Sequence, residues 1–199
     1  TLADAEVSYE DIQTNFNQVK FKVKETGEEI IIATTRPELI CTCATIIFNP
    51  DDERYKHLEG KTAITPLFNK EVPIQYHQQA QIEKGTGLVM MCSAGDLSDI
   101  RFFREMKLTP VIAIDRDGRM NDHAVFLKGL KVKEAREKII EELKNKNLLV
   151  KQTKVSHRTP ICERSKHEIE FIEMKEFYLQ QVKFKNKMAQ LAHEINFYD

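Results

Sequence analysis

The sequence predicts a mixed α/β fold that is rich in strands. Three observations lead to this prediction. Short runs with strand-like patterns dominate the first two thirds of the chain, and helical spacing is confined to a few segments. Hydrophobic residues make up 41% of the 199 residues, which is enough for a buried core. This length suits one domain, or one domain with an appendage, and glycine and proline are too sparse to indicate a linker.

The strands follow in order along the chain. Residues 19–23 alternate between apolar and polar side chains, as a half-buried strand does. Residues 30–33 form a continuous apolar run typical of a buried strand, and residues 44–48 form another that stops at an Asn-Pro-Asp-Asp turn signal. Further strands are expected at residues 72–75, 88–92, 110–114, 148–154 and 168–173, with a hairpin turn over residues 115–118.

Three helices are expected. The first runs to Lys107 from a cap at Ser98 or Asp96. Its core-facing side chains are expected to be Phe102, Phe103 and Met106. The second covers residues 132–146, because apolar residues recur there every three or four positions. These residues are Val132, Ala135, Ile139 and Leu143. The third is expected over residues 185–195.

Composition and motifs exclude several classes of function. The net charge of −1 gives no bulk attraction to nucleic acid, and no apolar stretch approaches the length of a membrane span. The acidic start is unlike a signal peptide, so we expect a cytoplasmic protein with reduced cysteines. The cysteines lack the spacing of a zinc site, and no P-loop or nucleophile elbow is present. We therefore expect no metal and no cofactor, and we expect the six histidines to lie on surfaces or loops.

Three stretches with an unusually specific sequence remain as candidate site segments: residues 34–38, 85–92 and 93–99. Asp96 and Asp99 stand three apart at a predicted helix start, which places both carboxylates near one face of the first turn. The helix dipole is expected to keep them ionised. Such a pair can hold an ammonium group or orient a water molecule, although helix capping alone also explains it.

The other candidates have ordinary structural explanations too. Thr34 and Thr35 fit a strand by β-propensity alone. Arg36 fits a surface salt bridge, and Glu38 fits a solvated turn. Cys92 offers a weak polar contact or fills space as a small buried residue. Taken one at a time, these residues do not decide between a site and a scaffold.

Six motifs in a fixed order carry a family resemblance. They are ATTRPE (residues 33–38), NPDDERYKHLEGK (49–61), GTG (85–87), CSAGD followed by SD (92–99), GRMN (118–121) and HRTPICERS (157–165). In this combination the chain resembles the editing domain of the class I valyl-tRNA synthetases, especially their archaeal branch. The resemblance covers nearly the whole chain. It implies the β-barrel-like fold of the valyl, isoleucyl and leucyl editing domains, inserted into a Rossmann catalytic core. Residues 1–155 would form the editing core, and residues 156–199 would return toward the catalytic core.

The resemblance also implies a reaction. This family hydrolyses the ester of tRNA charged with the wrong amino acid, which for the valyl enzymes is threonine. Valine against threonine is itself a standard illustration of why a second hydrolytic site is needed, since an apolar pocket cannot strongly reject an added hydroxyl. The partners would be the 3′ CCA end of tRNA(Val) and the rest of the synthetase. The chemistry needs a positioned water and a held substrate rather than a protein nucleophile.

Site roles follow from the resemblance. Asp99 would pair with the α-ammonium group, and Asp96 would orient the water or the substrate hydroxyl. Thr34 and Thr35 would bind the terminal adenosine or the water, and Arg36 would meet the 3′ end. The expected catalytic residues are Asp96, Asp99 and Thr35. The expected substrate-binding residues are Thr34, Arg36, Glu38, Gly85, Thr86, Gly87 and Cys92.

Two alternatives stay open. The first is an isoleucyl-type editing domain that clears Val-tRNA(Ile), against which the TTRPE motif argues. The second is a catalytically silent tRNA-docking module, against which the retained Asp99 argues. The chain also departs from bacterial members of the family, which commonly carry polar residues at its positions 39, 90, 92 and 95. These departures leave the contacts to the threonine hydroxyl open.

Overall fold

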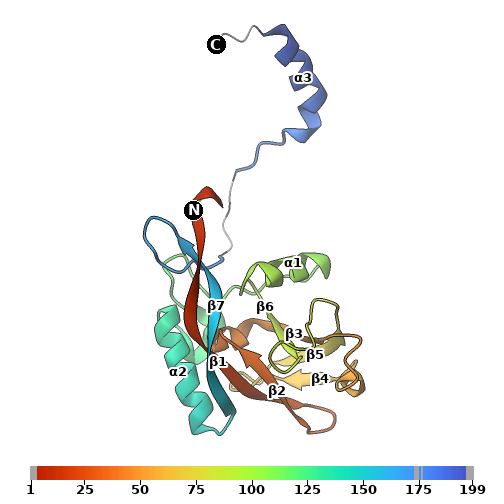
Figure 1. Ribbon diagram of the computed structural model, residues 1–199, viewed down its shortest axis with the longest axis vertical. Helices are drawn as coiled ribbons and strands as arrows, with labels where there is room; N and C mark the ends of the chain where they lie inside the picture. The colour runs from red at the N-terminus through yellow and green to blue at the C-terminus, as the bar shows by residue number, and fades with distance from the viewer. Residues whose placement is uncertain (1–3, 173–174, 176, 196–199) are drawn as a thin grey trace.

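The computed structural model describes residues 4–172, 175 and 177–195 (Figure 1). Within them the chain forms one seven-stranded sheet in the order β2-β1-β4-β5-β3-β6, with β7 added alongside β1. Most neighbouring strands run antiparallel, while β3 and β5 are parallel. The sheet curls into a half-barrel, which confirms the predicted mixed, strand-rich class.

The element bounds are as follows. The strands are β1 (Val7–Val23), β2 (Glu29–Thr34), β3 (Cys43–Phe48), β4 (Thr62–Ile64), β5 (Glu71–Tyr76), β6 (Val89–Cys92) and β7 (Leu149–Cys162). The α-helices are α1 (Leu97–Glu105), α2 (Val132–Asn145) and α3 (Lys185–Glu194). Short 3-10 segments are η1 (Asp4–Glu6), η2 (Pro37–Thr42), η3 (Lys56–Leu58), η4 (Asp122–Leu127) and η5 (Val182–Phe184).

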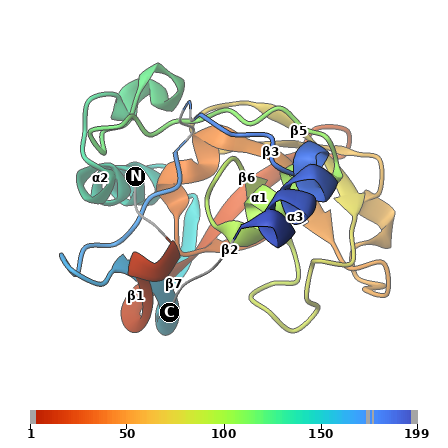
Figure 2. The same ribbon diagram turned by 90° about the horizontal axis from the view of Figure 1, so that it is seen from above.

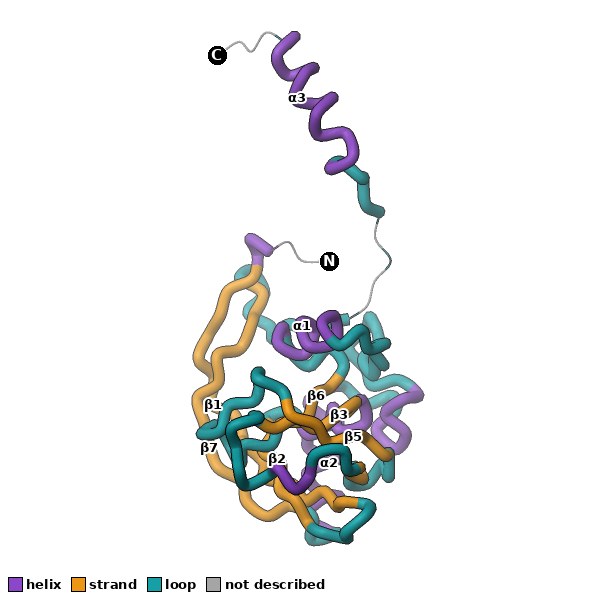
Figure 3. The backbone as a smooth tube through the Cα atoms, turned by 90° about the vertical axis from the view of Figure 1, so that its right-hand side faces the viewer, coloured by secondary structure: helices purple, strands orange, loops and turns teal. Residues whose placement is uncertain are grey.

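The long ribbon of β1 and β7 is the largest difference from the predicted strands. β7 was expected to end at residue 154 but continues to Cys162, so it passes through the expected division at residue 155. The first half of β1 was not predicted, because its polar sequence shows no apolar alternation. Side chains along this part of the ribbon are exposed or only half-buried, so its pairing with β7 rests largely on backbone hydrogen bonds. Figure 3 shows this ribbon extending from the body.

The main core lies between the sheet and α2. The predicted stripe of α2 is confirmed, since Val132, Ala135, Ile139 and Leu143 are all buried. Helix α1 packs Phe102 and Phe103 into a second, smaller apolar cluster against β3 and β6. Met106 was predicted to join them but is 38% exposed. It caps the end of α1, where the backbone turns away at Lys107 with a φ of 53°.

Two predicted strands are wrong. Residues 110–114 form only a single bridge, between Ile114 and Met120. Pro110 has no N–H for a ladder, and the N–H of Val111 donates to Ser93 Oγ at 2.8 Å instead. Residues 168–172 likewise make one bridge, between Ile161 and Glu168, while residue 173 lies outside the described residues. The hairpin turn is confirmed by the hydrogen bond from Gly118 N to Asp115 O at 3.0 Å.

The third predicted helix is confirmed as α3, which lies apart from the body in Figures 1 and 3. Its described side chains are all exposed, including the apolar Met188 and Leu191. Seen from above, α3 lies over α1, and α2 lies to the left of both (Figure 2). Among the residues described, no helix is long and apolar enough to cross a bilayer.

Candidate functional site

The site begins where β2 ends. Buried Asn17 of β1 donates from Nδ2 to the carbonyl oxygen of Thr34 at 3.2 Å, which holds the last residue of β2 in place. The Oγ1 of Thr34 then accepts the N–H of Arg36 at 3.0 Å, so its hydroxyl shapes the turn out of the strand. Pro37 starts η2 directly afterwards, as its fixed φ favours. This turn directs Thr35 and Arg36 out of the sheet.

The second part of the site is the loop between β6 and α1. Asp96 caps α1, because its Oδ1 accepts the N–H of Asp99 at 2.9 Å. Asp99 reaches back, and its Oδ1 accepts the N–H of Cys92 at 3.2 Å. An added Cβ at Gly95 would overlap the Asp99 carboxylate, so a larger residue at this position would force that side chain to shift. Helix capping is therefore confirmed for Asp96, while Asp99 packs inward.

The protonation of Asp99 differs from the sequence-based expectation. The pKa of this carboxyl is raised to about 8. Burial is the larger cause, and the negative charge of the neighbouring Asp96 is the second. The N–H of Cys92 and the charge of Arg36 act in the opposite direction but are weaker. The helix dipole was expected to keep both carboxylates ionised, which is wrong for Asp99 in the unliganded chain. A cationic group placed beside Asp99 would favour its ionised form.

An ionic cluster supports this part of the molecule. Glu38 is fully buried, and Arg36 and Arg136 both donate to its oxygens, Arg36 from Nε at 3.0 Å and Arg136 at 2.8 and 3.1 Å. Burial acts to raise the pKa of Glu38, but the two arginines hold it below its ordinary value. The two ordinary structural explanations, a surface salt bridge for Arg36 and a solvated turn for Glu38, therefore do not hold. Glu38 can act on a substrate only through the arginines, rather than by the direct contact expected.

These parts meet at a cavity of about 160 Å³. Thr35, Arg36, Gly95 and Asp96 line one side of it, and the ribbon of β1 and β7 lines the other. Residues 168–171 complete the wall. The structure thus brings two of the three candidate segments, residues 34–38 and 93–99, together at one cavity.

His157 is a cavity residue that the sequence analysis missed, since histidines were expected on surfaces or loops. It lies on β7, opposite Ile12 of β1, and its Nδ1 is 3.1 Å from the hydroxyl of Thr159. Burial lowers the pKa of this imidazole, and Lys84 lowers it further. The alternation of His157, Thr159 and Ile161 along one face of a strand was the available signal, had β7 been predicted to its full length.

The Gly-Thr-Gly segment lies beside the end of β2 but does not line this cavity. An added Cβ at Gly85 would lie 3.1 Å from Ala33 Cβ, so this loop packs directly on β2. The hydroxyl of Tyr55 donates a hydrogen bond to the carbonyl oxygen of Thr86 at 2.6 Å. Its own Oγ1 is buried and has no hydrogen-bond partner among the described residues. An unpaired buried hydroxyl of this kind is a candidate contact for a ligand.

Gly87 packs this loop against the turn at residues 49–54. It has a φ of 87°, and an added Cβ would lie 2.6 Å from Arg54 Nη2 and 2.9 Å from Asp52 Oδ2. Asp52 is buried and pairs with Arg54 at 2.6 Å, so this pair is structural.

Replacing Gly87 with alanine is expected to lower the free energy of unfolding. The matched control is Gly60→Ala, because Gly60 has a φ of 73° but nothing within 4 Å of an added Cβ. Both variants bear the strain of a left-handed backbone, but only Gly87→Ala must also displace the Asp52–Arg54 pair. We expect Gly87→Ala to be less stable than the control by about 1–3 kcal/mol in urea unfolding. Equal losses would show that the pair moves aside freely.

Metal binding finds little support in this arrangement. In the described ranges, no group of three His, Cys, Asp or Glu side chains is placed to hold a metal ion. All four cysteines are free thiols, and Cys92, expected to bind substrate, is buried with Cys43 as its cross-strand neighbour. Burial and the contact with Cys43 raise the pKa of the Cys92 thiol, Cys43 having the larger effect. It is therefore a neutral, buried group.

Comparisons with known proteins point to one family of enzymes. No family model matches the sequence. The valine–tRNA ligase of Nanoarchaeum equitans is 46% identical over 98% of this chain, and that of Aeropyrum pernix is 43% identical over 99%. The valine–tRNA ligase of the bacterium Rickettsia conorii is 39% identical over 99% of the chain. The chain spans about a quarter of the length of these curated relatives, at 26%, 24% and 24%.

A solved structure shares the fold. It is the LeuRS chain of a ternary LeuRS–tRNA–LeuAMS complex from Agrobacterium radiobacter K84. The match has a TM-score of 0.55 and 19% sequence identity, and it covers 74% of this chain and 20% of the other. At this identity the match speaks for the fold alone. It agrees with the strand-rich, curled architecture described above.

Proposed function

Since this chain belongs to the valine–tRNA ligase family, as a region about a quarter of the length of its relatives, we propose that it is the editing region. Its reaction is then hydrolysis of the ester bond in mischarged Thr-tRNA(Val). The observation that carries this proposal is that Asp96 lines a small cavity together with Thr35 and Arg36. Asp99 does not itself line the cavity, but it lies directly behind Asp96, whose Oδ1 accepts its N–H at 2.9 Å. Two carboxyl groups in this position can hold an ammonium group next to a reacting ester.

The chemistry needs few protein groups. The α-ammonium group of the aminoacyl ester pairs with Asp99 and draws that carboxyl into its ionised form. A water held near Asp96 and Thr35 attacks the ester carbonyl. The bond to the ribose oxygen breaks, and the ribose oxygen takes up one proton of the water. The other proton passes to solvent, and the amino acid leaves as a carboxylate. Positioning of water and substrate supplies most of the rate enhancement in such a reaction.

The size of the cavity suits a small acyl group. Engineered cavities of about 150 Å³ hold a molecule as large as benzene, so about 160 Å³ accommodates a threonyl group but not an adenosine as well. The adenosine would then lie outside, toward the Gly-Thr-Gly loop, where the buried Thr86 hydroxyl lacks a partner among described residues. Leu39 and Cys92 are buried, so we assign the threonine hydroxyl to the polar wall at Thr35 and Asp96.

Three further expectations rest on the same proposal. The partners are the 3′ CCA end of tRNA(Val) and the rest of a synthetase, and the place of action is the cytoplasm, where tRNA is charged. The C-terminal segment from residue 156 onward leads toward the catalytic core of that synthetase. The exposed apolar side chains of α3, among them Met188 and Leu191, are then available to pack on it.

A deacylation assay tests the function directly. The chain is incubated with Thr-tRNA(Val), Val-tRNA(Val) and Val-tRNA(Ile), and release of each amino acid is timed. We expect release of threonine at least 10-fold faster than release of valine from tRNA(Val), because valine leaves the polar wall unpaired. Faster clearance of Val-tRNA(Ile) would indicate the isoleucyl-type alternative. Binding of all three tRNAs without hydrolysis would indicate a docking module.

A further inference from the structure

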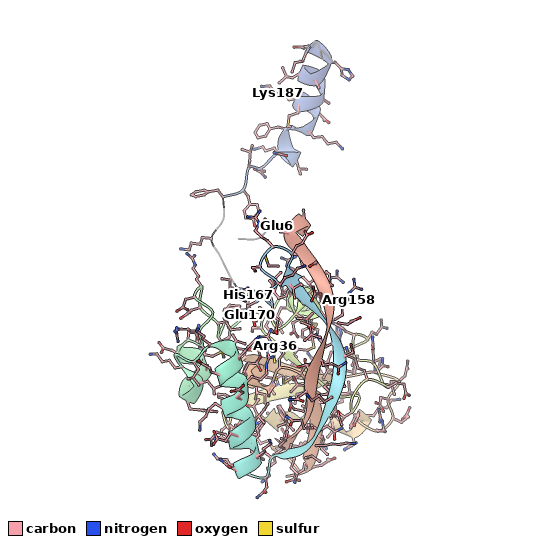
Figure 4. All side chains as sticks on the ribbon, turned by 60° about the vertical axis from the view of Figure 1, so that its left-hand side comes forward. Glu6, Arg36, Arg158, His167, Glu170 and Lys187 are labelled. Atoms are coloured by element: carbon pink, nitrogen blue, oxygen red, sulfur yellow. The ribbon has the colours of Figure 1, made fainter. Side chains whose placement is uncertain are left out.

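Residues Glu168–Phe171, here called the strap, form one wall of the cavity although they follow the end of β7. Glu170 is the strap residue that reaches the site. Its Oε2 lies 2.7 Å from Nη2 of Arg36, and both side chains are only 20% exposed. Figure 4 shows Arg36 and Glu170 close together in the space between α2 and the ribbon. An ion pair this sheltered is weakly screened by salt.

Every nitrogen group of the Arg36 guanidinium is engaged. Nε donates to Glu38 at 3.0 Å, Nη1 donates to the carbonyl oxygen of Gly95 at 3.3 Å, and Nη2 donates to Glu170. The guanidinium is planar and rigid, so two of these contacts largely fix the direction of the third. Gly95 directly precedes Asp96 in the chain. The place of the guanidinium therefore sets the position of the turn that carries the two aspartates.

The charges give Glu170 a role that Glu38 cannot take. Glu38 serves two arginines at once, Arg36 and Arg136. Its single negative charge does not balance both, and Glu170 supplies the second. Burial raises the pKa of Glu170, while Arg36 acts against this shift and favours the charged form. Burial disfavours the charge of Arg36, but Glu38 and Glu170 together hold its pKa above the usual range. Without Glu170 the guanidinium would be pulled toward Glu38 and away from the Gly95 carbonyl.

We propose that Glu170 is a positioning residue of the hydrolytic site, which acts through Arg36 to hold the turn at Gly95 and Asp96. This inference rests on the proposed editing function. It makes the strap part of the site, although the strap lies more than 60 residues beyond the aspartates in the chain. It also means that hydrolysis depends on the position of the strap against the cavity.

The test compares Glu170→Ala and Glu170→Gln with the wild-type chain in steady-state deacylation of Thr-tRNA(Val). The glutamine oxygen can still accept from Arg36, whereas alanine removes the contact. We expect kcat to fall on the order of 10- to 100-fold in Glu170→Ala and clearly less in Glu170→Gln, with KM little changed. The control is Glu163→Gln, which makes the same charge change at an exposed position directly after β7 and outside the strap.

A second variant pair distinguishes positioning from loss of structure. If Glu170 acts through Arg36, adding Glu170→Ala to Arg36→Gln produces no further fall in kcat. Thermal unfolding of each variant is measured alongside. Equal kcat in wild type and Glu170→Ala overturns the inference, as does a loss that multiplies independently in the double variant. Absence of hydrolysis in the wild-type chain would instead count against the proposed function itself.

Discussion

Replacing Asp99 with asparagine is expected to slow hydrolysis of Thr-tRNA(Val) strongly, with residual activity, while leaving the fold intact. Asparagine keeps the size of the side chain and can still accept the Cys92 N–H, which Asp99 Oδ1 accepts at 3.2 Å. It cannot carry the negative charge that would hold the α-ammonium group of the substrate. Loss of a buried charge partner for a bound ion typically costs 2–5 kcal/mol, so we expect a fall in kcat/KM of about 100-fold or more.

The same substitution is expected to change how stability depends on pH. The folded-state pKa of Asp99 is about 8, above the ordinary value of 3.8, because burial and Asp96 disfavour the charge. The stability that this group contributes is therefore complete below pH 3.8 and is lost as pH rises through about 8. Between these values the wild type should lose up to about 1.4 kcal/mol per pH unit relative to Asp99→Asn.

Urea unfolding of both proteins at pH 6, 7, 8 and 9 measures this difference. Each m-value is compared to confirm that the unfolding transition itself is unchanged. Parallel pH profiles for the two proteins would mean that Asp99 is ionised throughout, as the helix dipole alone had suggested. Deacylation by wild type should in turn rise with pH toward 8, because the ionised form binds the ammonium group. Asp99→Asn should show no such rise.

Replacing Glu38 with glutamine is expected to cause a large loss of stability. Glu38 is 0% exposed and is the shared partner of Arg36 and Arg136, with the closest contact at 2.8 Å. Removing one member of a buried ion pair typically costs 3–5 kcal/mol, because the remaining charge is left without compensation. The two arginine side chains are 20% and 22% exposed, so water relieves part of this penalty. We therefore expect about 3 kcal/mol.

Chemical unfolding at pH 7 measures the loss. The matched control is Glu141→Gln, since Glu141 pairs with Lys138 at 3.0 Å on the exposed face of α2 and should be neutral. The pKa of Glu38 is below its usual value of 4.5, so its contribution is present above pH 4.5 and disappears as pH falls through the folded-state value. A loss no larger than that of the control would show that the arginines find other partners.

The sequence by itself determined the local elements of this protein. Apolar periodicity identified α2 and most strands of the central sheet, because side-chain spacing reflects which face is buried. Short-range chemistry limited the cap of α1 to Ser98 or Asp96, and the cap is Asp96. The motifs located both candidate segments that line the cavity. Each of these features depends on residues that lie within a few positions of one another.

Only the tertiary structure decided how these elements act together. Arg36 meets Glu170 across 134 residues of chain, and Glu38 meets Arg136 across 98. No local pattern shows which long-range partner a charge will find, so the sequence offered only substrate binding or a solvated turn for Glu38 and not a buried ion pair. The raised pKa of Asp99 has the same origin, because burial depends on what packs over the helix start. Local patterns fix the elements, whereas the distance and burial that govern site chemistry arise only when the sheet curls and closes.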